Sequence, residues 1–221
     1  MTTYSLVLPF PWKRLPVEDP AEAHAAARAF ARHATRLAPP DVAPDERTRV
    51  VVELEGRLRG WLDQLRDSGT VDLYLPAAPL GGVSLNASFV VASVIPNATA
   101  DASWVGPVHQ ALRAEGATEV LIDGHAWTRT DETIRSDGEV LIEAGLPARR
   151  ISYTTAVPGD ERRWAMVTAT VIGDGDPTSD QTGLVVELFD AIMSTWRWDA
   201  VPVETHDRDD AGDAHPVETS S

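Results

Sequence analysis

Three side chains of the kinds that hydrolases use occur in the middle of the chain: Ser84, Asp123 and His125. In the segment DGHAW, Asp123 precedes His125 by two residues on an expected strand or its turn, and we expect both side chains to point to the same face. An Asp–His pair can orient a general base, but catalysis also requires a nucleophile or a metal ion. Ser84 in GVSLN resembles the G-x-S-x-G elbow, although Asn86 replaces the second glycine and a strand follows instead of a helix. These residues define a hydrolase hypothesis; the alternative for His125 is a hydrogen-bonded structural histidine.

The acidic segment DGDPTSD is a candidate for cation binding, because it brings Asp174, Asp176 and Asp180 close together in sequence. An EF-hand loop requires a glycine at its sixth place and a glutamate at its twelfth, where this chain has Ser179 and Val185. A turn followed by a helix with Ser179 or Asp180 as its N-cap explains the same residues. We therefore expect no dedicated metal site, and weak cation binding stays open.

The composition restricts the classes of function. The 221 residues include 34 acidic and 19 basic ones, and the formal net charge of −15 opposes binding to phosphate backbones and anionic membranes. There is no cysteine, which excludes disulfides, thiolate catalysis and cysteine-ligated zinc. Neither G-x-G-x-x-G nor G-x-x-x-x-G-K-[ST] occurs. We therefore predict no cofactor and no nucleic-acid partner.

The N-terminus, MTTYSLVLPFPWKR, carries its positive charges after a short apolar stretch, whereas a signal peptide has the opposite order and a longer stretch. No segment approaches the roughly 18 to 20 apolar residues that a membrane helix needs. We therefore expect a cytoplasmic protein without membrane insertion.

Two helices are predicted in the first third of the chain. Asp19 and Pro20 are typical of an N-cap and a first helical residue, and they precede an alanine-rich helix over residues 21–37. The second helix, residues 45–66, has apolar residues at three- and four-residue steps, with Gly69 just beyond its end. The first should pack closely against another element, and the second is the clearest amphipathic helix of the chain.

Segments rich in β-branched and aromatic residues, separated by Gly, Pro or Asp-Gly turns, predict an antiparallel sheet. In WAMVTATVI, for example, Ala165, Val167, Ala169 and Val171 would share one face. The expected strands are residues 4–9, 71–76, 84–96, 118–124, 125–134, 139–144, 149–159 and 162–173. A further helix is expected over residues 104–114.

The stretch FDAIMSTWRW lies at the end of the part of the chain that is expected to fold. Val185, Phe189 and Ile192 recur at helical spacing, so we expect a helix that starts near residue 179 to bury them in the core. Two tryptophans around an arginine follow; they could cover a sheet edge or form an aromatic anchor of the kind enriched at protein interfaces. The candidate partner-binding residues are Trp196, Arg197 and Trp198.

From Asp199 onward the chain has seven acidic residues, one arginine and almost no large apolar residue, which predicts disorder. We expect residues 1–199 to form a single α/β domain, followed by a disordered acidic tail over residues 200–221.

Three successive segments, DGHAWTRT, RRISYTTAVPGDERRWAMVTATVIGDGD and LVVELFDAIMSTWRW, resemble a family of uncharacterised actinobacterial proteins. Genes of that family often accompany type VII secretion genes, and the C-terminal half is similar to the Mog/PsbP fold. The resemblance covers roughly residues 12–198 and implies an α+β fold, an antiparallel sheet flanked by helices in an α/β/α sandwich. It supplies no catalytic residues, and relatives of the fold mostly act as binding or assembly modules.

These observations together favour a non-enzymatic protein-binding or assembly accessory, with a link to type VII secretion implied by the resemblance. One alternative is a structural subunit of a larger particle or secretion machine. The other is a hydrolase centred on Ser84, Asp123 and His125. The sequence names neither the partner nor the oligomeric state.

Overall fold

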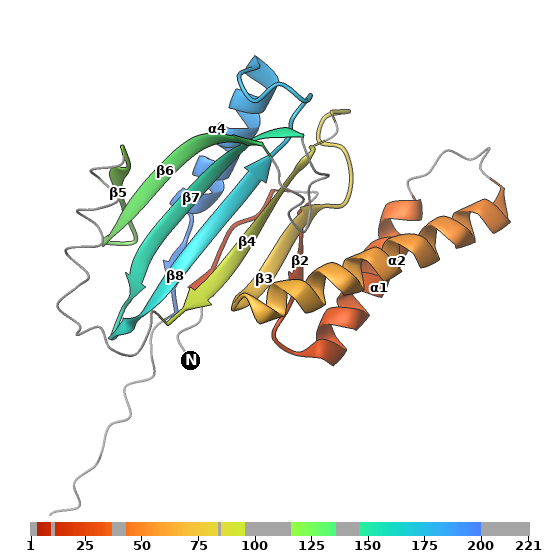
Figure 1. The fold of residues 1–221 in the computed structure, drawn as a ribbon, viewed down its shortest axis with the longest axis horizontal. Helices are drawn as coiled ribbons and strands as arrows, with labels where there is room; N and C mark the ends of the chain where they lie inside the picture. Colours follow the sequence, from red (N-terminus) through yellow and green to blue (C-terminus); the bar gives the residue numbers. More distant parts are fainter. Residues whose placement is uncertain are drawn as a thin grey trace, which may run out of the picture.

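The computed structural model describes residues 4–9, 12–36, 43–83, 85–95, 116–135 and 146–199. Ser84, the helix expected over residues 104–114, the strand expected over residues 139–144 and the acidic tail lie outside the described residues. Within them, the protein has the predicted α+β fold, in which helices flank an antiparallel sheet (Figure 1).

The central element is a seven-stranded antiparallel sheet. In spatial order its strands are β2 (Trp12–Pro16), β3 (Thr70–Pro76), β4 (Ala87–Val94), β8 (Asp160–Val171), β7 (Pro147–Val157), β6 (His125–Arg135) and β5 (Thr118–Ile122). Strand β8 lies in the middle and pairs with β4 on one side and β7 on the other. Its alternation is confirmed, because the four residues predicted to share one face, from Ala165 to Val171, are all buried.

Three described helices cover the sheet: α1 (Pro20–Arg36), α2 (Pro44–Asp67) and α4 (Asp180–Ser194). Adjacent residues of β3 identify the two faces, because side chains alternate along a strand. Leu73 packs in the apolar cluster of α1 and α2, whereas Tyr74 packs in the cluster that contains α4. The α1–α2 hairpin therefore lies on one face and α4 on the other, which gives the predicted α/β/α arrangement (Figure 1).

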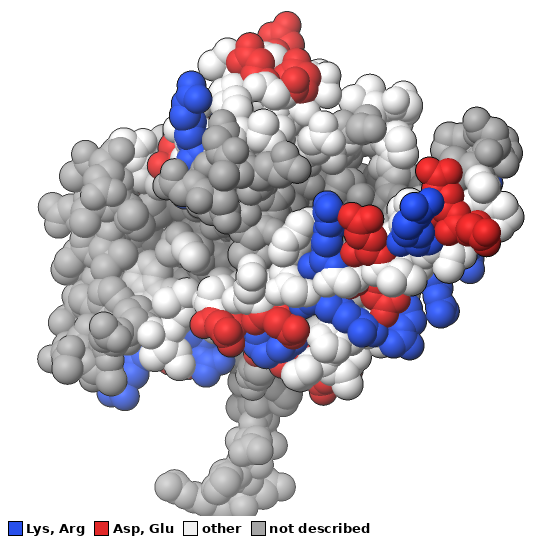
Figure 2. All heavy atoms as spheres, turned by 45° about the vertical axis from the view of Figure 1, so that its right-hand side comes forward, with Lys and Arg blue, Asp and Glu red and all other residues white. Residues whose placement is uncertain are grey.

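Helices α1 and α2 form a hairpin whose contact surface follows from the predicted patterns. The buried residues of α1 are Ala23, Ala27 and Ala31, and those of α2 are Leu58 and Leu62. Gly69 takes a φ of 77° directly after α2, and its N–H donates to the carbonyl of Arg66. Acidic and basic side chains are intermixed over the outer side of the hairpin (Figure 2), where α2 carries pairs such as Arg57–Glu53.

Helix α4 begins as predicted. Ser179 is its N-cap, since its hydroxyl accepts a hydrogen bond from the Thr182 N–H at 3.1 Å. The buried face includes Val185, Phe189 and Ile192. Phe189 is enclosed by aromatic rings of the sheet, because its centroid lies 5.4 Å from that of Phe89 and 5.7 Å from that of Tyr153.

Two short elements were not expected from the sequence. Strand β2 forms one edge of the sheet, although its sequence is WKRLP. The ends of the described chain also pair with each other, since β1 (Tyr4–Ser5) is antiparallel to β9 (Arg197–Trp198). The strand expected over residues 4–9 is therefore only two residues long, and the chain after α4 is extended.

We expect Phe189→Ala to lower the free energy of unfolding by about 3 to 5 kcal/mol, because it removes a large side chain from a packed core. Leu184→Ala on the same helix provides a matched control: Leu184 is 65% exposed, and its truncation should change stability by less than about 0.5 kcal/mol. Urea denaturation of both variants measures the difference. Equal losses would show that α4 is not packed through the Phe189 face.

Candidate functional site

The segment after α4 supplies the predicted partner-binding residues, and the structure separates them. Trp196 is fully buried: its ring stacks on Tyr4 with centroids 4.2 Å apart and meets the Trp127 ring edge-on at 5.2 Å. Two alternatives were open for Trp196, and its burial excludes the exposed anchor. The physical reason is that α4 ends at Ser194 and the extended chain beyond it turns this side chain into the core.

Trp198 and Arg197 lie nearer the surface. Trp198 is partly buried, stacked on Trp127 at 6.0 Å and edge-on to Trp196 at 5.1 Å. The Arg197 side chain is 56% exposed, and its Nη1 donates to the Trp196 carbonyl at 2.6 Å. Of the three predicted residues, Arg197 is thus the one that mainly faces solvent.

Of the three residues of the hydrolase hypothesis, Asp123 and His125 lie among the described residues. Asp123 lies in a turn and His125 begins β6. Asp123 and Gly124 have φ values of 51° and 74° and form the two-residue turn between β5 and β6, as the Asp-Gly sequence favours. The Asp123 carboxylate accepts the backbone N–H of Trp198 at 2.9 Å and lies 3.6 Å from Arg197 Nε. Asp123 therefore anchors β9, and Ser84 lies outside the described residues.

The acidic loop before α4 is held by its own hydrogen bonds. Asp174 Oδ1 accepts from the Ser179 hydroxyl at 2.7 Å, and Asp176 Oδ1 accepts from the Thr178 N–H at 2.8 Å. The hydrogen bond from Ser179 holds the pKa of Asp174 below its ordinary value. In the part of the chain that the structure describes, no group of three acidic or histidine side chains is arranged to hold a metal ion.

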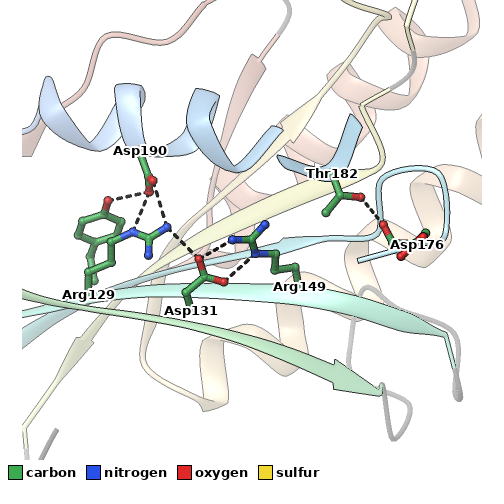
Figure 3. A network of polar contacts seen from close by, with 7 residues as sticks. Arg129, Asp131, Arg149, Asp176, Thr182 and Asp190 are labelled. Carbon is green, nitrogen blue, oxygen red and sulfur yellow. Dashed lines mark hydrogen bonds and ion pairs between the residues drawn. The ribbon is translucent and has the colours of Figure 1, made fainter. Parts of the chain in front are cut away.

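A polar network fastens α4 to the sheet (Figure 3). Asp190 of α4 accepts hydrogen bonds from Tyr153 at 2.7 Å and from Arg129 at 3.0 and 3.1 Å. Arg129 also reaches Asp131 at 3.1 Å, and Arg149 binds Asp131 through two contacts of 2.7 and 2.8 Å. Two guanidinium groups and two carboxylates thus alternate, so the network is balanced in charge and its role is structural.

The electrostatics of this network follow from its geometry. The hydrogen bonds from Arg149 hold the pKa of Asp131 below its ordinary value. Burial, followed by the hydrogen bond to Asp190, raises the pKa of the Tyr153 hydroxyl. Tyr153 therefore stays protonated and donates to Asp190 throughout the physiological range.

A cavity of about 320 Å³ lies beside the pair of strands β1 and β9. Its polar and aromatic wall residues are Tyr4, Arg14, Glu18, Ser93, Arg163, Trp196 and Asp199. Aliphatic residues of β3, β4, β7 and β8 form the rest of the wall. Among the described residues, none of the lining side chains is a histidine that could serve as a general base. The mixed lining suits ligand binding, and it includes both residues that flank β9.

Sequence reasoning missed this cavity. Asp72 supports one side of it: the carboxylate is fully buried and accepts hydrogen bonds from the Tyr4 hydroxyl and from Arg14 Nε, the latter at 2.7 Å. Burial raises the pKa of the neighbouring Tyr74 to about 12. The local signal in the sequence is the segment VDLYLP, in which Asp72 stands between apolar residues of an expected strand. An acid in such a position indicates a buried polar contact.

Comparisons with known proteins add little. No protein-family model and no curated protein matches the chain. The crystal structure of LpqN, involved in cell envelope biogenesis of Mycobacterium tuberculosis, is similar at 9% identity and a TM-score of 0.45, covering 90% of this chain and 85% of that chain. A similarity of this degree supports no statement about function. None of the described helices is long and apolar enough to cross a membrane.

We expect Asp131→Asn to lower the free energy of unfolding by about 1 to 3 kcal/mol at pH 7, because it weakens hydrogen bonds to two arginines. The folded-state pKa of Asp131 lies below its unfolded-state value, so its contribution is present above the unfolded-state pKa and is lost as the pH falls through the folded-state pKa. The difference between variant and wild type should therefore shrink below about pH 4.

The matched control for this prediction is Glu132→Gln. Glu132 follows Asp131 on β6, is 55% exposed and pairs with Arg150 at 3.7 Å, so its replacement should change stability by less than about 1 kcal/mol. Urea unfolding between pH 3 and pH 7 makes the comparison. A pH-independent loss in Asp131→Asn would contradict the assigned role of its charge.

Proposed function

We propose that this chain is a non-enzymatic protein-binding or assembly accessory, which contacts its partner through Arg197 and the mouth of the neighbouring cavity. The observation that carries the proposal is the position of Arg197. Its guanidinium is largely exposed on β9. Trp196 precedes β9 and Asp199 follows it, and both residues line the cavity. Arginine beside aromatic rings and an open cavity is a composition enriched at protein interfaces.

The rigid setting of β9 supports the same proposal. The Trp198 ring packs on two other tryptophans, its backbone is held by Asp123, and Arg197 caps the end of α4. A partner that binds here meets a surface whose side chains are already ordered, which reduces the entropic cost of association. The hydrolase alternative has less support, because Asp123 serves β9 and lies in a turn.

A narrower form of the proposal makes the protein an accessory of type VII secretion. That form rests on the resemblance of the segments from DGHAWTRT to LVVELFDAIMSTWRW, and it predicts a secretion component as the partner. The other alternative, a structural subunit, predicts a large closed assembly of the purified protein. Light scattering distinguishes them, since an accessory should be small and of defined mass.

We expect Arg197→Gln to reduce capture of the native partner from a host lysate at least fivefold, because the substitution removes an interface charge and its fixed hydrogen-bond donors. Arg57→Gln is the control: Arg57 is exposed on α2, away from β9. Quantitative mass spectrometry of the captured proteins measures the effect, with melting temperatures of both variants to verify folding. Unchanged capture by a folded Arg197→Gln variant would exclude this surface as the interface.

A further inference from the structure

The charges around the cavity are not balanced. Arg14 is already paired with the buried Asp72 at 2.7 Å, and Arg163 lies 3.5 Å from Asp160. Glu18 and Asp199 also line the cavity, and no basic group of the described residues forms an ion pair with either. Glu18 and Asp199 are therefore the two charged wall residues whose charge no ion pair of the described residues neutralises. A ligand that complements this cavity carries a positive charge, not a negative one.

The cavity wall also carries a hydrogen-bond donor without an acceptor. Trp196 Nε1 is buried and has no hydrogen-bond partner among the described residues. Buried donors that lack an acceptor cost free energy, so a ligand oxygen placed against them would be favoured. The second requirement for the ligand is thus an oxygen acceptor.

Apart from Ser93, the remaining wall is aliphatic, with Val91, Val157 and Ala165 all buried. The volume of about 320 Å³ lies at the lower end of the range of small-ligand pockets, roughly 300 to 1,000 Å³. It admits one or two residues of an extended chain, and a helix of about 10 Å diameter is too wide. The third requirement is therefore a small apolar group.

We propose that this cavity binds the free N-terminus of a peptide whose first residue is apolar. The α-ammonium group lies against the carboxylates of Glu18 and Asp199, and the first carbonyl oxygen accepts from Trp196 Nε1. The apolar side chain contacts the aliphatic wall. A free amino acid shares this chemistry but carries a second, negative charge, which the carboxylates of Glu18 and Asp199 disfavour. The assignment rests on the proposed binding function and specifies what the partner presents.

Isothermal titration calorimetry with three probes tests the assignment on the full chain. L-leucinamide carries the ammonium, the carbonyl and the apolar group; N-acetyl-L-leucinamide lacks the ammonium; L-leucine adds the carboxylate. We expect L-leucinamide to bind about tenfold or more tightly than N-acetyl-L-leucinamide, because a charged hydrogen bond is lost. L-leucine should bind more weakly than L-leucinamide. Equal affinity of the amide with and without the acetyl group overturns the proposal, and tighter binding of L-leucine assigns the site to free amino acids instead.

Variants locate the binding to this cavity. Glu18→Gln should weaken L-leucinamide about fivefold or more and leave N-acetyl-L-leucinamide unchanged, because it removes one charge that faces the ammonium group. Glu53→Gln, an exposed glutamate of α2 outside the cavity, should leave both affinities unchanged. If Glu18→Gln binds L-leucinamide like the wild type, the proposal fails. Such a result leaves the interface at Arg197 intact, since partner capture is measured separately.

Discussion

The buried carboxylate of Asp72 is the contact on which the N-terminal part of the structure depends. Burial of a charge costs free energy unless the charge is paired and hydrogen-bonded. The buried Asp72 carboxylate therefore requires its contacts with Tyr4 and Arg14. Tyr4 comes from β1 and Arg14 from the edge strand β2, and neither segment has a large apolar face of its own. Through Tyr4, the constraint reaches Trp196 and the wall of the cavity. One aspartate on β3 thereby links Tyr4 of β1 to Arg14 of β2.

The same face of the sheet uses a second polar contact for a different purpose. Asp190 brings α4 into register with β6 and β7, while the aromatic residues below it supply most of the apolar contact. On the opposite face, small and branched side chains form the apolar cluster between the α1–α2 hairpin and β3. Polar contacts join these elements as well: Arg28 of α1 pairs with Glu55 of α2 at 3.2 Å, and Arg66 Nε donates to the Val17 carbonyl at 2.9 Å.

The sequence predicted the elements that bury a periodic face. The alanines of α1, the heptad-like spacing of α2, the alternation of β8 and the Ser179 cap are local patterns, and each was confirmed. Strand β2 was not predicted from the sequence, because WKRLP combines two charges with a proline, which only an edge strand tolerates. The cavity was not predicted either, because its wall residues are as far apart in sequence as Tyr4 and Asp199, and no spacing rule connects them. Trp196 was misplaced because the burial of a residue after a helix depends on how the chain leaves that helix.

The pairing of β1 with β9 also has a consequence for the order of events during synthesis. Tyr4 is synthesised nearly 200 residues before its strand partner Trp198. At roughly 5 to 20 residues per second, the interval is about 10 to 40 seconds. During that time Asp72 can already meet Tyr4, but the stacking of Tyr4 on Trp196 cannot yet form. Pairing of β1 with β9 is thus a late, non-local step of folding, and until then Tyr4 lacks its stacking partner Trp196.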